Sequence, residues 1–329
     1  MAFSAILGQE HALALLQKAF ASARLGHAYL FYGPSGVGKK LAAVQFAKAL
    51  ACQNTVAEAC DRCASCHTIT TGNHPDVVVI NPEGASIRIE HIRAVQRQLG
   101  YKPYTSPRTV VIIDGCERLT SPAANALLKT LEEPPATVLL LLLTSQKDAL
   151  PLTILSRCQQ IPFRALAPAH IQAILLQQGV DQSTAELAAT LAEGRLDTWM
   201  QADISQGLAR RQNAYALLQE RGHTTHMPLF LLARQWAGSR EQCEEILHWL
   251  SLFCRDLVML KVASTTPLYN HDLQADLTHL ASSLALEPLL DLFASLAQLQ
   301  HYLTMNVNPQ LTFEQLVIQL QQCFGAPPG

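Results

Sequence analysis

The first half of the chain alternates short apolar runs with segments of helical periodicity. Runs rich in Val, Ile, Leu and aromatic residues predict buried strands at 27–32, 76–80, 110–113, 138–143 and 159–163. Between them, apolar residues three or four positions apart predict helices at 39–50, 88–99 and 123–131. This alternation predicts an α/β domain built on a parallel sheet that is covered on both faces.

The second half of the chain has a different pattern. From about residue 168 only helical periods are found, with two short helices expected in 171–192 and a helix end at Gly179. A longer helical region is expected from 204 to 323. The fold class is therefore α/β plus all-α, with the α/β domain ending near residue 165. Two apolar faces are predicted in the first half, formed by Leu41, Val44, Ala47 and Leu50, and by Ile89, Ile92, Val95 and Leu99.

Composition narrows the class of protein. The chain has 329 residues, 49% of them hydrophobic and 15% charged, which is typical of a globular protein of about two domains. The longest aliphatic run, 138–143, is far shorter than the ~20 residues that span a bilayer, so no membrane segment is expected. The N-terminus has no basic region before an apolar stretch, and a cytoplasmic location is expected. The net charge of −2 gives no global attraction to nucleic acid.

A glycine-rich loop follows the first predicted strand. Residues 33–40 read GPSGVGKK and match G-x-x-x-x-G-K-[ST] except at the eighth position, where Lys40 replaces the hydroxyl residue. The amides of Gly36 to Lys39 could still hold an anion, and Lys39 could contact a phosphate. An ammonium group cannot bind Mg²⁺, so fast ATP hydrolysis is not expected.

Two later strands end in polar residues that would lie beside this loop. Asp114 follows the strand at 110–113, where P-loop proteins carry the acid on the Mg²⁺ side. Gly115 fills the position at which related motor ATPases have a Glu that activates water, and Glu117 is predicted to point elsewhere. The candidate degenerate nucleotide site comprises Gly33, Gly36, Gly38, Lys39, Lys40, Asp114 and Thr144.

Four cysteines fall within fifteen residues, at positions 52, 60, 63 and 66. Two-residue gaps let neighbouring thiolates reach one ion, so Cys52, Cys60, Cys63 and Cys66 predict a structural Cys₄ zinc site in an insertion at 52–66. The spacing of the last three also occurs in ferredoxins. The iron–sulfur motif needs another Cys three residues later, and Thr stands at positions 70 and 71.

A basic segment leaves two interpretations open. Arg93, Arg97 and Lys102 could follow a DNA backbone, and the first two share a helix face at a spacing of four residues. The same pattern is typical of a solvated helix face. Arg157, in Ser156-Arg157-Cys158, could serve a phosphate offered by a neighbouring subunit, although a single arginine more often forms structural ion pairs.

The order of these motifs resembles a known family. The loop at 33–39, the four cysteines, the sequence GNHPD at 72–76, the strand ending at Asp114, the sequence ANALLKTLEEPP at 124–135 and LSRC at 155–158 follow one another. Together they resemble the clamp-loader subunits of bacterial DNA polymerase III, of the AAA+ class, and most specifically the delta-prime type. The resemblance implies an AAA+ P-loop domain at 1–165, a helical lid at 166–203 and a helical collar at 204–329.

The resemblance also implies a function. The expected partners are gamma/tau and delta subunits in a pentameric ring, and through the complex the sliding clamp and primed DNA. Arg157 would be offered in trans to the ATP of the adjacent motor subunit. Lys40, Gly115 and Asp197, which stands where motor subunits carry a lid arginine, indicate a subunit of the polymerase holoenzyme that does not itself hydrolyse ATP.

Two alternatives remain at this stage. One is an active ATPase of the gamma/tau type, and the other is a zinc-bearing DNA-binding module. Zinc is the expected cofactor, whereas the sequence leaves nucleotide binding by the degenerate loop open.

Overall fold

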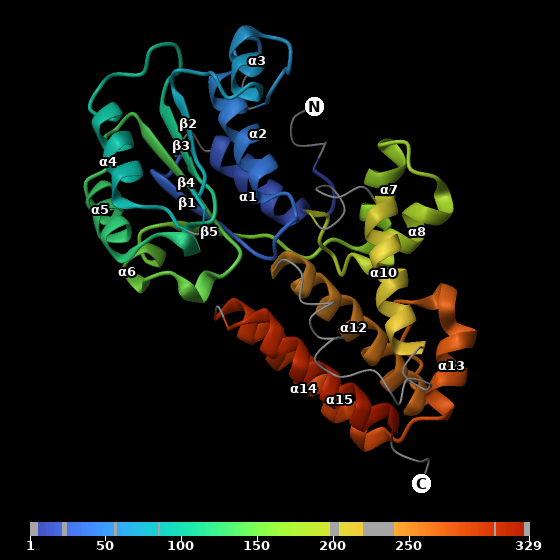
Figure 1. Ribbon diagram of the computed structural model, residues 1–329. Coiled ribbons are helices and arrows are strands. Elements are labelled where there is room, and N and C mark those ends of the chain that lie inside the picture. The colour runs from blue at the N-terminus through green and yellow to red at the C-terminus, as the bar shows by residue number, and fades with distance from the viewer. Residues whose placement is uncertain are drawn as a thin grey trace. The chain divides into compact units, whose positions relative to one another are not determined.

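The computed structural model describes residues 6–21, 25–55, 58–84, 86–197, 204–219, 240–305 and 307–325. The chain divides into two compact units, one formed by residues 1–185 and 192–198 and the other by residues 186–191 and 199–329 (Figure 1). The three-way division into P-loop domain, lid and collar stays a prediction.

A five-stranded parallel sheet forms the centre of the first unit. Its strands are β1 (Ala28–Tyr32), β2 (Val77–Ile80), β3 (Thr109–Ile113), β4 (Val138–Thr144) and β5 (Gln159–Pro162). Their order is β2-β3-β4-β1-β5, and every neighbouring pair is parallel. The predicted strands and parallel sheet are therefore confirmed. This order places the carboxyl ends of β3 and β1 on either side of β4.

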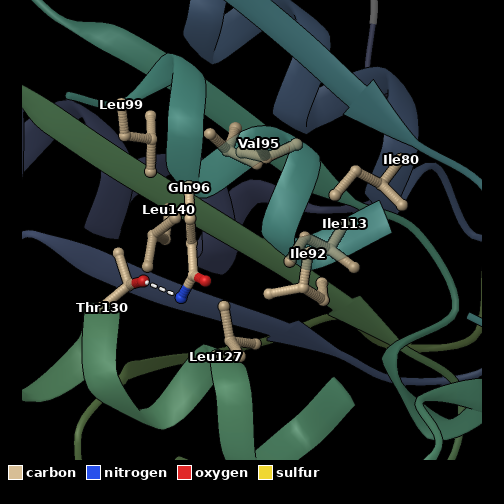
Figure 2. Close-up of a pocket in the computed structure, with 10 residues that line it drawn as sticks. Ile80, Ile92, Val95, Gln96, Leu99, Ile113, Leu127, Thr130 and Leu140 are labelled. Atoms are coloured by element: carbon tan, nitrogen blue, oxygen red, sulfur yellow. Dashed lines mark hydrogen bonds between the residues drawn. The ribbon is translucent and has the colours of Figure 1, made fainter. Parts of the chain in front are cut away.

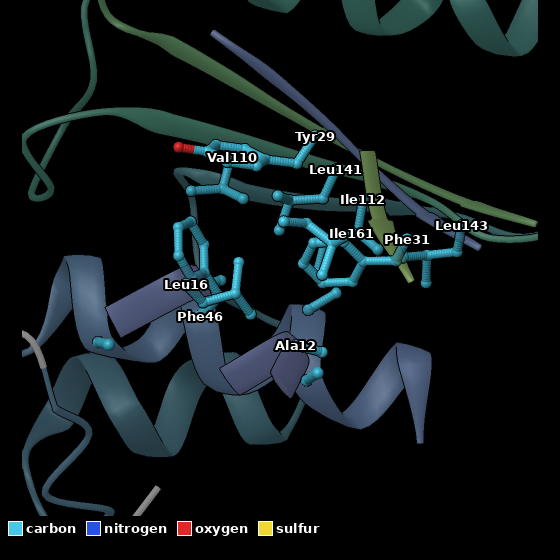
Figure 3. Close-up of a cluster of buried hydrophobic side chains, with 14 of the residues drawn as sticks. Ala12, Leu16, Tyr29, Phe31, Phe46, Val110, Ile112, Leu141, Leu143 and Ile161 are labelled. Carbon is cyan, nitrogen blue, oxygen red and sulfur yellow. The ribbon is translucent and has the colours of Figure 1, made fainter. Parts of the chain in front are cut away.

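Helices cover both faces of this sheet (Figure 1). α1 (Glu10–Ala21) and α2 (Lys39–Ala51) pack on one face, against alternate strand residues such as Phe31, Ile112 and Leu141 (Figure 3). α4 (Ile89–Gln98) and α5 (Ser121–Glu132) cover the other face, against residues such as Leu30 and Leu140. Because successive strand residues point to opposite faces, each strand is buried on both sides, which explains its uninterrupted apolar sequence.

The predicted face of α2 is confirmed in part. Ala47 is buried in the cluster against the sheet, and Val44 and Leu50 pack against that cluster, but Leu41 is 44% exposed. The inner face also includes the buried residues Ala42, Ala43 and Phe46, which were not predicted. The predicted face of α4 is confirmed at Ile92, Val95 and Leu99, which are buried, while Ile89 packs at its border. α1 and α3 (Ala64–Thr70) were not predicted.

A polar side chain joins the two helices on the second face. Gln96 of α4 donates from Nε2 to the Ala126 carbonyl oxygen of α5 at 2.8 Å and to Thr130 Oγ1 at 2.9 Å (Figure 2). These bonds border a small apolar gap of about 10 Å³ between the helices and the sheet. Gln96 therefore fixes the C-terminal half of α5 against α4.

The remaining elements are mostly helical. The first unit also contains η1 (Cys116–Arg118), η2 (Lys147–Ala149), α6 (Leu152–Leu155) and α7 (Pro168–Gln177), and α8 (Gln182–Leu191) follows. The second unit contains α10 (Ile204–Gln219), α12 (Arg240–Lys261), η4 (His271–Leu273), α13 (Gln274–Ser282), α14 (Leu286–Thr304) and α15 (Pro309–Gly325). The predicted fold class is thus confirmed as a parallel α/β domain followed by a C-terminal domain whose described elements are all helical. Among the described helices, none is both long and apolar enough to cross a bilayer.

Asp76 explains the GNHPD motif at 72–76. Its carboxylate accepts backbone N–H bonds from Tyr104, Thr105 and Ser106 at 2.6, 2.7 and 2.8 Å, and the Thr105 hydroxyl at 3.0 Å. Burial acts to raise the pKa of Asp76, but these hydrogen bonds outweigh it and lower the pKa. Asp76 therefore closes the loop between α4 and β3.

We expect Asp76→Asn to lower the free energy of unfolding by about 1–3 kcal/mol at pH 7, because three backbone N–H groups lose the charged acceptor that a buried carboxylate provides. A carboxylate with a lowered folded-state pKa stabilises the protein above the ordinary Asp pKa of about 3.9 and loses this effect as the pH falls through the folded value. The difference between wild type and variant in chemical denaturation should therefore shrink below about pH 4. Asp148→Asn, at an exposed site, is the control. An equal difference at pH 7 and pH 3 would contradict the assignment.

Candidate functional site

The glycine-rich loop connects β1 to α2 as expected. Gly33 has a φ of +145°, and a Cβ at this position would overlap the carbonyl oxygen of Phe163. The Gly33 N–H donates to the Thr144 carbonyl oxygen at 3.3 Å, which ties the loop to the end of β4. Gly36 and Gly38 also have positive φ angles, of 67° and 96°. The loop thus has the left-handed backbone that its glycines predict.

Lys39 is directed back onto its own loop. Its ammonium donates to the carbonyl oxygens of Gly33, at 2.7 Å, and Pro34. The side chain is buried, and burial lowers the pKa of Lys39 against the opposing influence of Glu117, Asp114 and Asp197. The lysine that would contact a phosphate is therefore bonded to carbonyl oxygens, and three carboxylates act on it.

Lys40 binds the acid that P-loop proteins use on the Mg²⁺ side. Its Nζ lies 3.1 Å from Asp114 Oδ2 and donates to Asn81 Oδ1 at 2.7 Å. Asn81 follows β2 and Asp114 follows β3, so the ammonium bridges two neighbouring strand ends. The residue that breaks the motif is thus an ion-pair partner of Asp114, and Asn81 is a site residue that the sequence analysis missed.

The prediction for Glu117 was wrong. Its carboxylate accepts hydrogen bonds from the hydroxyl groups of Thr144, at 2.8 Å, and Ser145, at 2.7 Å, at the end of β4. Gly115, with φ of +72°, allows the chain to turn into η1, which brings Glu117 back to the strand ends. Burial acts to raise the pKa of Glu117, but hydrogen bonds led by Ser145 lower it. The Thr144 hydroxyl group therefore donates a hydrogen bond to Glu117, and its oxygen accepts a hydrogen bond from the Gln146 N–H.

Asp197 lies against the loop within the same unit. A Cβ on Gly36 would overlap Asp197 Oδ1, and the Leu196 N–H donates to the Gly36 carbonyl oxygen at 3.1 Å. The acid that the sequence analysis aligned with a lid arginine thus contacts the glycine-rich loop. Its negative charge faces the position where an anion would bind.

Arg157 follows α6 and is held by three acceptors. Nη1 donates to the Thr153 carbonyl oxygen at 3.0 Å and to Ser156 Oγ at 3.3 Å, and Nη2 lies 2.8 Å from Glu132 Oε1. The Arg157 side chain is 35% exposed and the Glu132 side chain 49%. The arginine is therefore fixed at its base and open to solvent on its outer side.

The four cysteines are brought together as predicted. One Sγ atom from each of Cys52, Cys60, Cys63 and Cys66 lies within 4.8 Å of the others. A tetrahedral Zn²⁺ with Zn–S bonds of about 2.3 Å sets its sulfurs about 3.8 Å apart, so the donor set fits zinc after a small contraction. The backbone N–H groups of Cys63 and Cys66 donate to the sulfurs of Cys60 and Cys63, at 3.3 and 3.4 Å, and would support bound thiolates.

Thiol acidity differs across this cluster. Burial raises the pKa of Cys52, but hydrogen bonds led by Thr55 bring it to about 6. Burial and the neighbouring Cys63 raise the pKa of Cys66 to about 12. A metal ion binding here must therefore displace protons.

Lys48 of α2 holds the insertion through an ion pair with Asp61 at 2.8 Å.

The candidate DNA residues lie apart from the loop site. Arg93 and Arg97 are exposed on α4, and Lys102 is exposed on the following segment. All three side chains are therefore accessible to solvent, which leaves both the DNA contact and the solvated helix face open.

Comparison with known proteins follows the two halves of the chain. A family model described as "DNA polymerase III, delta subunit" matches residues 8–167, and a model described as "DNA polymerase III, delta subunit, C terminal" matches 205–322. The DNA polymerase III subunit delta' of Bacillus subtilis is 32% identical over 321 residues, covering 95% of this chain and 96% of that protein. The chain belongs to the delta-prime family of DNA polymerase III subunits.

Other relatives match shorter parts of the chain. The delta' of Pseudomonas aeruginosa is 41% identical over 141 residues, covering 42% of this chain and 43% of that protein. The tau subunit of Bacillus subtilis is 38% identical over 199 residues, covering 58% of this chain but 35% of that protein. Of these three relatives, the delta' of Bacillus subtilis is the one that matches nearly the whole of this chain.

Proposed function

We propose that this delta-prime subunit acts in the clamp loader without hydrolysing ATP itself. The observation that carries the proposal is the Lys40–Asp114 ion pair at 3.1 Å. A hydrolytic P-loop holds Mg²⁺ between its Ser/Thr hydroxyl and this acid. Here the positive charge beside Asp114 comes from an ammonium, which repels a divalent cation. Gly115 also supplies no base for the attacking water.

The charges around the loop support weak nucleotide binding at most. Glu117, Asp114 and Asp197 all act electrostatically on Lys39. The lysine is already bonded to two loop carbonyl oxygens, so a phosphate would have to replace those bonds while facing three carboxylates. The Thr144 hydroxyl group likewise donates its hydrogen bond to the Glu117 carboxylate and not to a phosphate.

Arg157 is the residue that we propose contributes to catalysis, in trans, at the ATP of a neighbouring motor subunit. An arginine finger needs a partly exposed guanidinium on a surface that a neighbour covers. The Arg157 side chain is 35% exposed, and its contacts with Thr153 and Ser156 hold it at the end of α6. Its exposure and anchoring therefore support a role toward a neighbouring subunit.

The second unit is proposed to join a pentameric ring with delta and gamma/tau subunits. Leu286, Leu290 and Phe293 of α14 are each more than a third exposed and lie at the spacing of one helix face. An apolar stripe of this kind is suited to packing against helices of other subunits. In this proposal residues 166–203 form the lid and 204–329 the collar, and the ring loads the sliding clamp onto primed DNA.

We also propose a structural zinc site and additional contacts to DNA. A structural zinc ion held by Cys52, Cys60, Cys63 and Cys66 would brace the insertion next to α2. Arg93, Arg97 and Lys102 would add backbone contacts to DNA held within the complex. The alternative of an active gamma/tau-type ATPase is supported by the partial match to a tau subunit, and the Lys40–Asp114 pair opposes it.

Titration of the isolated protein with a fluorescent ATP analogue tests the site directly. We expect that Mg²⁺ gives no increase in affinity for the wild-type chain, because Lys40 neutralises Asp114. In Lys40→Thr, which restores the hydroxyl, Mg²⁺ should tighten binding about tenfold or more. Lys40→Met removes the ammonium without adding a ligand and serves as the matched control. Mg²⁺-dependent ATP turnover by the wild-type chain would contradict the proposal.

A further inference from the structure

We propose that Glu132 is a positioning residue for Arg157, an inference that rests on the proposed role of Arg157 in trans. The sequence ANALLKTLEEPP at 124–135 is one of the motifs that carry the resemblance, and neither of its two acids contacts the glycine-rich loop in the interactions described above. Glu132 Oε1 lies 2.8 Å from Arg157 Nη2, although the residues are separated by β4 in the sequence. The ion pair thus connects two of the family motifs.

Glu132 stands on a rigid element. It is the last residue of α5, directly after the buried Thr130 and Leu131. Gln96 of α4 bonds to the Ala126 carbonyl oxygen and to Thr130 (the latter in Figure 2), so α4 holds this end of α5 at two points. By contrast, Arg157 follows α6, which is only four residues long. A carboxylate on the firmer helix can therefore orient a guanidinium on the weaker turn.

Some N–H donors of the Arg157 guanidinium hold the side chain in place, and the others remain available to a ligand. Arginine has five N–H groups in a planar fork. Nη1 serves Thr153 and Ser156, and one hydrogen of Nη2 serves Glu132. Among the contacts of the described residues this leaves Nε–H and the second Nη2 hydrogen, which suffice for two phosphate oxygens. Glu132 thus orients the guanidinium group and leaves two of its N–H donors available for a phosphate.

The exposure of the pair suits this role. The Glu132 side chain is 49% exposed and the Arg157 side chain 35%, so water screens the pair and its contribution to folding is small. An effect of Glu132 on catalysis would consequently come from the orientation of Arg157 and not from the stability of the domain. Misplacement of a catalytic group by about 1 Å can reduce a rate up to a hundredfold.

The test uses a loader reconstituted from this chain with delta and gamma/tau subunits, ATP, sliding clamp and primed DNA, followed by rapid phosphate release. Arg157→Ala first identifies the phase of release that depends on the arginine. We expect Glu132→Ala to slow that phase about five- to tenfold with the KM for ATP unchanged. Glu132→Gln keeps an oxygen that accepts from Nη2 and should stay within about twofold of wild type.

Glu133→Ala is the matched control, because Glu133 is exposed, carries the same charge and lies beside Glu132 without a contact to Arg157 among the described residues. In the Arg157→Ala background, Glu132→Ala should cause no further slowing, whereas a general structural role would slow the double variant further. An Arg157-dependent phase that Glu132→Ala leaves unchanged or accelerates overturns the positioning role alone. If Arg157→Ala removes no phase, the arginine finger has failed and the positioning role fails with it.

Discussion

Arg157→Ala is expected to slow hydrolysis at the adjoining ATP site of the loader on the order of a thousandfold, the usual effect of losing an arginine finger. The loss arises because the guanidinium neutralises charge that develops on the transferred phosphoryl group. Other ATP sites in the ring should keep their rates. Rapid phosphate release should therefore lose one kinetic phase while the remaining phases persist.

Two variants make the Arg157 result specific. Arg157→Lys keeps the charge but not the planar fork, and it should recover only a small part of the missing phase. Arg164→Ala changes an exposed arginine whose backbone, and not its side chain, bonds to Gln9, and wild-type kinetics are expected. Native mass measurement should find all three variants assembled. Equal kinetics for Arg157→Ala and Arg164→Ala would refute the trans role.

Cys66→Ser is expected to reduce bound zinc from about one ion per chain to nearly none at equal protein concentration. Structural zinc contributes roughly 10–16 kcal/mol of apparent binding free energy in small zinc modules, so the loss of one thiolate should release the insertion from its folded form. Metal analysis would measure the zinc, and hydrogen exchange over α3 would measure the loss of protection. The sheet should keep its protection, because its core clusters do not include these cysteines.

Cys323→Ala is the control for Cys66→Ser, since Cys323 is a buried thiol of the second unit and not part of the cluster. Its zinc content should equal that of the wild type. Iron in place of zinc, or equal zinc in both variants, would rule out the structural zinc site.

Much of the fold follows from local sequence patterns. The strands are continuous apolar runs because both faces of the sheet are covered, and the loop at Gly33 needs glycine where Phe163 approaches. The four cysteines were equally predictable because their ligand spacing is local. The strands, the glycine-rich loop and the cysteine cluster could therefore be predicted because each depends on a pattern of residues close together in the chain.

The missed features depend on distant contacts. Glu117 reaches Thr144 only because the backbone turns at Gly115, and Asn81 reaches Lys40 only because β2 lies beside β3. On α2, Leu41 was predicted to face the core and is exposed, whereas Ala42 and Ala43 are buried there. A hydrophobicity pattern carries no information about the direction of a turn, and on α2 it favoured a large outward leucine over small inward alanines.

The ion pair between Lys40 and Asp114 has a consequence for timing within a ring of ATPases. A magnesium ion arrives with its nucleotide and leaves with the product, so the strand end of a motor subunit experiences a changing charge during each cycle. Lys40 is covalently part of the chain, and its ammonium lies 3.1 Å from Asp114. Under the proposed function, the charge beside Asp114 is therefore the same whether or not the neighbouring subunits hold nucleotide.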